Sequence, residues 1–186
     1  MGVKKRYQAF VIAILLAFAI GLSVGRRDSA LYGTAGADPA GHVSVKAYRD
    51  GELFYEFDEH NLITTEGSKH IRNFMGWANQ SNVASIYLSL SNDVTPLITW
   101  IKLPSEITGS GLARATGVPS SVNATAYQVA YTWTASAPAS VQCTGLHWSA
   151  AGDSSNNLLA AASISSVSLQ ANDMLQVTWT VNIPDG

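Results

Sequence analysis

The chain has 186 residues, of which 47% are apolar and only 13% are charged, and its formal net charge is −2. This length suits one domain together with a targeting segment. Lys4, Lys5 and Arg6 supply three of the cations and residues 1–25 contain no acid, so residues 26–186 carry a formal charge of −5. No basic face is evident, and the composition therefore excludes nucleic acid from the expected partners.

The N-terminus has the layout of an export signal. A basic cluster is followed by residues 9–25, a stretch of 17 residues without a charge, which is typical of a secretory signal. As a helix this stretch would be about 25 Å long, at the short limit of a membrane span. Ser23 and Gly25 form a small-x-small pattern for cleavage, whereas Arg26 and Arg27 fit the outer flank of an uncleaved anchor. Both alternatives predict an extracellular, cell-surface protein that contacts the membrane through residues 1–25 before processing.

Residues 26–41 have the composition of a linker. They are mostly small, with Gly and Pro, and only Leu31 and Tyr32 are sizeable. This composition predicts a flexible tether. The alternative is an arm that pairs with the sheet edge of a neighbouring subunit, with Leu31 and Tyr32 as the self-assembly candidates.

The folded domain is expected over residues 42–186 and begins with a hairpin signal. Residues 42–48 alternate apolar and polar side chains, Asp50 and Gly51 supply a tight turn, and residues 52–57 return. Thr65 is the expected cap of a short helix over residues 66–76. Further strands are expected at residues 61–64, 83–90 and 98–103.

The C-terminal half repeats a strand pattern. Its blocks alternate in polarity and are separated by Gly, Pro, Asn, Asp or Ser. The blocks are residues 111–117, 126–136, 141–150, 156–164 and 173–183. Two apolar faces must be buried because side chains alternate across a strand. These faces consist of Leu175, Val177, Trp179, Val181 and Ile183, and of Tyr127, Val129, Tyr131 and Trp133. The pattern predicts a mainly β fold, an antiparallel β-sandwich of jelly-roll type with one short helix and an N-terminal hydrophobic helix.

The edges of this sandwich are expected to be poorly guarded. No Lys or Arg follows Arg114, and Pro119, Pro138 and Pro184 fall in expected turns or at the chain end. Exposed edge strands pair with other chains unless charge or Pro prevents it. The sequence therefore predicts copies of itself as partners.

An ordered set of segments over residues 43–183 carries a family resemblance. It consists of the Asp-Gly hairpin, HNLITTEGSKHIRNFMG, ASIYLSLSND, LPSEITGSGLARATG and VSLQANDMLQVTWTV. This order resembles tail-fibre-like virion structural proteins of phages and archaeal viruses, and related archaeal surface proteins. The resemblance implies a role in appendage structure rather than in chemistry. The hydrophobic N-terminus favours the cell-surface form.

Catalytic signals are weak. The four histidines, His42, His60, His70 and His147, include no pair at the i, i+4 spacing of a helix-borne zinc site. His147 is expected on a sheet face. The Ser-rich residues 163–168 lack the GxSxG context of a hydrolase, and no phosphate-binding loop is present. We therefore expect no enzyme, no catalytic residue and no bound cofactor other than a calcium ion.

Three acidic residues are weak calcium candidates. Asp93, Asp153 and Asp173 lie in expected turns near Asn residues, where Asx side chains stabilise turns without a metal. Asn79 and Asn123 match the N-glycosylation pattern. The single cysteine, Cys143, excludes an intrachain disulfide, and its place in an alternating strand predicts a buried, inert thiol.

Two functions compete at this level. The first is a non-catalytic structural subunit of an extracellular self-assembling appendage, a filament or pilus-like fibre. The alternative is a monomeric cell-surface binding module, for carbohydrate for example, or a virion tail-fibre-like protein. Trp133 and Trp179 are expected in the core rather than stacked on a sugar.

Overall fold

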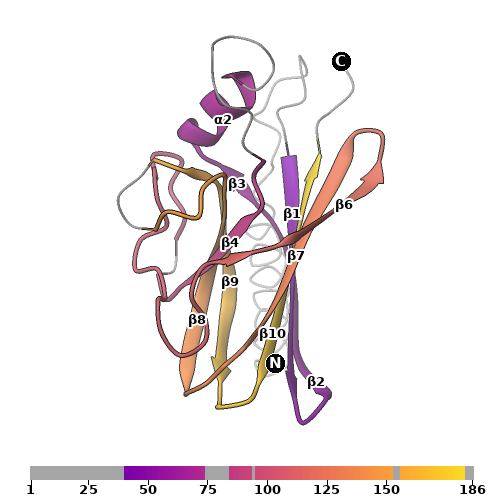
Figure 1. Ribbon diagram of the computed structural model, residues 1–186, viewed down its shortest axis with the longest axis vertical. Coiled ribbons are helices and arrows are strands. Elements are labelled where there is room, and N and C mark those ends of the chain that lie inside the picture. The colour runs from indigo at the N-terminus through magenta and orange to yellow at the C-terminus, as the bar shows by residue number, and fades with distance from the viewer. Residues whose placement is uncertain (1–39, 74–83, 94, 153–155, 183–186) are drawn as a thin grey trace, which may run out of the picture. The chain divides into compact units, whose positions relative to one another are not determined.

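The computed structural model describes residues 40–73, 84–93, 95–152 and 156–182 (Figure 1). These residues form two five-stranded antiparallel sheets and one short helix. The predicted mainly β, sandwich-like fold is thereby confirmed in its coarse form. The expected N-terminal hydrophobic helix and the linker up to residue 39 lie outside the described residues.

The strands are distributed evenly between the sheets. The first sheet has the order β2 (Glu52–His60), β1 (Ala40–Arg49), β10 (Met174–Asn182), β7 (Ala126–Thr134) and β6 (Val118–Asn123). The second sheet has the order β3 (Leu62–Ile63), β9 (Leu158–Leu169), β8 (Ala139–His147), β4 (Tyr87–Ser91) and β5 (Ala115–Thr116). The first and last described strands, β1 and β10, pair with each other in the middle of the first sheet.

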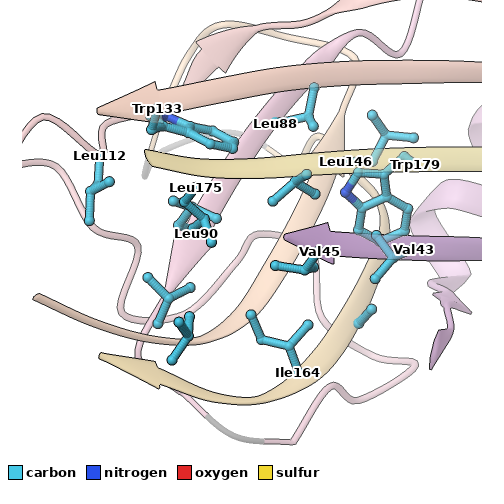
Figure 2. Close-up of a cluster of buried hydrophobic side chains, with 14 of the residues drawn as sticks. Val43, Val45, Leu88, Leu90, Leu112, Trp133, Leu146, Ile164, Leu175 and Trp179 are labelled. Atoms are coloured by element: carbon cyan, nitrogen blue, oxygen red, sulfur yellow. The ribbon is translucent and has the colours of Figure 1, made fainter. Parts of the chain in front are cut away.

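The core lies between the inner faces of the two sheets. Trp179 is 0% exposed and Trp133 is 3% exposed, and both rings lie among aliphatic side chains of facing strands (Figure 2). The alternation in the last strand predicted this face correctly, apart from Ile183, which lies outside the described residues. Burial of such side chains is the main favourable contribution to folding.

Two chain segments cross from one sheet to the other at the rims. One passes from β2 to β3 through Asn61, and the other passes from β5 to β6 through Gly117. A Cβ atom at Gly117 would lie 2.4 Å from Val129 Cγ1 and 2.5 Å from Leu88 Cδ1. Glycine is therefore required where this segment bends between the layers.

The helix is present where it was predicted and begins one residue earlier. Helix α2 spans Thr65–Arg72, and its N-cap is Thr64 rather than Thr65, because the Thr64 hydroxyl accepts a hydrogen bond from the Gly67 N–H at 2.9 Å. Gly67 packs so closely on β9 that a Cβ atom would lie 1.9 Å from the Leu159 carbonyl oxygen. Residues 74–76 of the predicted helix lie outside the described residues.

Several strand predictions are wrong in position. Residues 98–103 form turns and bends instead of a strand. Two of their side chains, Trp100 and Leu103, join Cys143 in a small apolar cluster on the outer face of the second sheet. Ile98 and Ile101 remain exposed. The 111–117 strand is reduced to β5, and β4 starts at Tyr87 rather than at residue 83.

Strand β6 was missed altogether. Only two of its residues, Val118 and Val122, are sizeable apolar ones, and Pro119 was assigned to a turn. Pro119 lies instead in an edge strand, where its missing N–H group is tolerated.

Candidate functional site

A chain of buried polar side chains crosses the outer face of the second sheet. His147 Nε2 lies 2.7 Å from the Ser89 hydroxyl, and His147 Nδ1 lies 2.8 Å from Asn157 Oδ1. Ser89 and His147 are 0% exposed and Asn157 is 1% exposed. This is the most enzyme-like arrangement in the described part of the chain.

Strand alternation places these groups on one face. Leu88 and Leu90 point into the core, so Ser89 between them points to the opposite face. Ser89 pairs in register with Gly145 of β8. A Cβ atom at Gly145 would lie 2.9 Å from His147 Nε2 and 3.2 Å from the Ser89 hydroxyl oxygen. The absent side chain of Gly145 therefore leaves the space in which the histidine and the serine meet.

Two charged side chains, Arg114 and Glu106, extend this series of hydrogen bonds. Arg114 donates two hydrogen bonds to Glu106, at 2.8 Å and 2.6 Å, and a third to Asn157 Oδ1 at 3.2 Å. The Arg114 and Glu106 side chains are 6% and 11% exposed. We call the five side chains together the buried network; its members are Ser89, Glu106, Arg114, His147 and Asn157.

The hydrogen bonds fix the tautomer of His147. The Asn157 amide nitrogen donates to the Ala151 carbonyl at 2.7 Å, so Asn157 Oδ1 is the acceptor for the histidine. His147 then carries its proton on Nδ1, and Nε2 accepts a hydrogen bond from the Ser89 hydroxyl. Burial first, and the Arg114 charge second, lower the pKa of His147 to about 3. The ring is therefore neutral at physiological pH.

This order of groups is that of a nucleophile, a base and an orienting residue. A nucleophile must contact its substrate, however, and neither Ser89 nor His147 has exposed surface. Each polar atom described in the network has a partner within the protein, which is the normal state of buried polar groups. The folded structure thus gives a substrate in solvent no access to Ser89, and the network connects β4 and β8 to the loops that cover them.

The calcium candidates are not brought together. Both carboxylate oxygens of Asp173 accept hydrogen bonds from Arg49, at 2.9 Å and 2.7 Å, and this pairing lowers the pKa of Asp173. Asp93 follows β4, where its backbone N–H donates to the Ser91 hydroxyl. Asp153 lies outside the described residues. Within the described ranges, no group of three or more His, Cys, Asp or Glu residues is placed to hold a metal ion.

The remaining candidate residues divide between the surface and the undescribed parts of the chain. Asn123 is exposed at the end of β6, and its Oδ1 accepts hydrogen bonds from the backbone N–H and the hydroxyl of Thr125, at 2.8 Å and 3.1 Å. Asn79, Leu31 and Tyr32 lie outside the described residues.

Cys143 and Trp148 lie where their environment limits reactivity and access. Cys143 is buried, and burial, followed by the Asp93 charge, raises the pKa of its thiol to about 12. The predicted burial of the thiol is confirmed, and a thiol with a raised pKa is rarely the reactive thiolate. Trp148 stacks on His70 with ring centroids 4.2 Å apart, so this ring is already partly covered.

The rim strand β6 is the second candidate site, and it differs from the buried network in exposure, charge and hydrogen bonding. All six of its residues are exposed, and Val118 and Val122 are 71% and 45% exposed. It contains no ionisable side chain, and among the described strands it pairs only with β7. One side of this strand therefore presents N–H and C=O groups to solvent.

The other rims of the two sheets are shorter or charged. Strands β3 and β5 contain two residues each. Strand β2 carries the acidic residues Glu52, Glu56, Asp58 and Glu59. Acidic side chains of this kind discourage pairing with another strand. Strand β6 is thus the one long rim strand of the described sheets without a charged residue.

Comparison of the chain with family models, with curated proteins and with solved structures gave no match. Among the described residues, no helix has the length and apolar character needed to cross a membrane.

Proposed function

We propose that the protein is a non-catalytic structural subunit of an extracellular appendage that assembles from copies of itself. One observation supports this above all: β6 is an exposed, uncharged rim strand with two exposed valines. Such an edge offers backbone hydrogen bonds and apolar contact to a further strand. No Lys or Arg follows Arg114 and β6 contains no charged residue, so no charge guards this edge against pairing.

The proposal assigns a role to each part of the chain. Residues 1–25 direct export as a signal peptide or a membrane anchor. Residues 26–41 act as a linker and donor arm, with Leu31 and Tyr32 as its apolar anchors, and β1 takes up the last two of these residues. A head-to-tail contact of this kind generates a filament when successive copies do not return to the first one, and the proposal takes this open form. The jelly-roll class within the sandwich-like folds belongs to this proposal as well.

The binding-module alternative is less well supported. Sugar binding by stacking requires exposed aromatic rings, and Trp133 and Trp179 are buried in the core. The virion tail-fibre-like alternative gives the protein the same structural role, but in a virus particle instead of at a cell surface.

The test is expression of the full chain followed by electron microscopy of the cell surface and of shed material. We expect filaments whose main component, by mass spectrometry, is this protein. If the exported protein stays monomeric at high concentration over days, with or without calcium, the self-assembly proposal fails. The binding-module alternative then takes its place.

A further inference from the structure

We infer that β6 is the acceptor edge of the assembly, and that its occupant is the uncharged stretch of residues 29–37 from a second copy. This inference rests on the self-assembly proposed above and names the surface and the partner segment. Residues 29–37 contain no ionisable group other than Tyr32, and β6 contains none. Neither strand would have to bury a charge when the two pair.

The competing rim, β2, is less suited to the same segment. An uncharged strand laid along it would remove water from the carboxylates of β2, which is costly without compensating partners. Lys46 already pairs with Glu56 at 2.9 Å. The Tyr55 hydroxyl donates a hydrogen bond to the Ser165 carbonyl of β9, so β2 is also tied to the second sheet at this point.

The lengths of the two segments agree. Strand β6 has six residues, which span about 20 Å at about 3.3 Å per residue. Residues 29–37 extended span about 30 Å, enough to follow the whole strand. Leu31 and Tyr32 are consecutive, so in a strand they point to opposite faces. One of them therefore lies on the same face as the exposed Val118 in any register.

The direction of the strands favours a second copy over the same chain. Asn123 at the end of β6 lies in one row across the first sheet with Ala126, Asn182 and Ala40, where β1 begins. Residues that precede Ala40 in the same copy would therefore have to follow β6 in the parallel direction. A second copy is free to run antiparallel, as all neighbouring strands of both sheets do. Antiparallel pairing is the more stable arrangement per residue.

The first experiment uses cysteine cross-linking of the full chain. Cys143 is 0% exposed, so introduced cysteines are the accessible thiols. One tagged chain carries Ser120→Cys on β6, and a differently tagged chain carries Ser29→Cys, Thr34→Cys or Ala35→Cys. The control replaces Ser120→Cys by Asp58→Cys on β2.

A docked strand raises the local thiol concentration to roughly the millimolar range. With the chains at micromolar concentration, we therefore expect at least one cysteine of residues 29–37 to cross-link to Ser120→Cys quickly. The rate should be at least about tenfold higher than that of any arm cysteine with Asp58→Cys. Equal rates at both rims would overturn the inference. A disulfide that forms only inside monomers carrying both Thr34→Cys and Ser120→Cys would also overturn it, in favour of the same chain as the occupant.

The second experiment separates this inference from the proposed function. Ser120→Lys places a charge on the β6 rim, and Thr132→Lys places one on the exposed outer face of the adjacent β7. We expect Ser120→Lys to abolish filaments and Thr132→Lys to retain them, with unchanged circular dichroism spectra in both. Filaments in both variants would overturn the β6 assignment and leave self-assembly standing. A wild-type protein that forms no filaments would overturn both.

Discussion

The buried network and the β6 rim handle polar groups in opposite ways. In the network, Ser89 and His147 have no exposed surface, and their polar atoms are paired inside the protein. On β6 every residue is exposed, and the backbone groups that face away from β7 have no partner strand among the described residues. The region that resembles a catalytic site is closed to solvent, whereas the region with unremarkable side chains is available to a partner.

This comparison shows that residue identity and availability are separate properties. A Ser–His–Asn sequence of hydrogen bonds carries chemical meaning only where a substrate can reach it. Serine, proline and valine on an open rim carry none of that chemistry, yet they leave backbone groups free for pairing. Changes in the network should therefore affect stability, and changes on β6 should affect association.

The largest effect on stability is expected from Arg114→Ala. The substitution leaves the Glu106 carboxylate, which is 11% exposed, without the guanidinium that pairs with it. Removing one partner of a buried ion pair costs roughly 3–5 kcal/mol, and urea denaturation should detect this loss. The control is Lys69→Ala, which breaks an exposed pair with Glu66 and should cost under about 1 kcal/mol. Equal losses in the two variants would show that the Arg114 pair is effectively solvated.

Acidification should destabilise the protein through His147. The pKa of this ring is lowered from 6.5 to about 3 in the folded state, so the unfolded chain binds the proton more tightly. The stabilising contribution is complete above about pH 6.5 and is lost as the pH falls, at about 1.4 kcal/mol per pH unit. At pH 5 the expected loss is about 2 kcal/mol.

Chemical denaturation between pH 7 and pH 5 measures this slope. The matched variant is His147→Gln, which has no titrating ring and should show a flatter dependence over the same range. An identical slope in both proteins would assign the acid sensitivity to other groups.

Ser89→Ala is expected to have a smaller effect. It removes the hydroxyl that donates to His147 Nε2, and the buried acceptor is left without a partner. An unsatisfied buried group costs about 1–3 kcal/mol, and we expect the lower part of this range because the removed group is small and neutral. Ser120→Ala on β6 is the control and should change the unfolding free energy by less than about 0.5 kcal/mol. A neutral Ser89→Ala variant would indicate that water replaces the hydroxyl.

The sequence predicted strands well where their apolar faces alternate. The faces of β7 and β10 were assigned correctly because Trp133, Val177 and Trp179 alternate with polar residues. Strand β6 could not be predicted, since a rim strand with both faces in solvent needs no apolar pattern. Residues 98–103 were wrongly predicted as a strand for the opposite reason, because a loop that packs on a sheet also carries apolar side chains.

The buried network left almost no local signal in the sequence. Ser89 and His147 are 58 positions apart, and Asn157 and Arg114 lie in loops whose course depends on the whole fold. The prediction placed His147 on a sheet face, which is correct, but did not foresee that loops cover this face. Gly145 was the one local sign, and its meaning depends on the cross-strand register with Ser89.

The smallest effect on stability is expected from Val118→Ala on β6. Val118 is 71% exposed, so its truncation should change the unfolding free energy of the dilute protein by less than about 0.5 kcal/mol. The matched variant is Val129→Ala on the adjacent β7, where the same residue type is 0% exposed. Val129→Ala removes two buried methyl groups at about 0.8 kcal/mol each, so it should cost at least about 1.5 kcal/mol. Denaturation at several protein concentrations distinguishes the two kinds of burial. A loss above about 1 kcal/mol for Val118→Ala that persists on dilution would mean that this chain itself covers β6, and the contrast between the network and the rim would fail. A loss that grows with protein concentration would instead show that Val118 becomes buried only between copies.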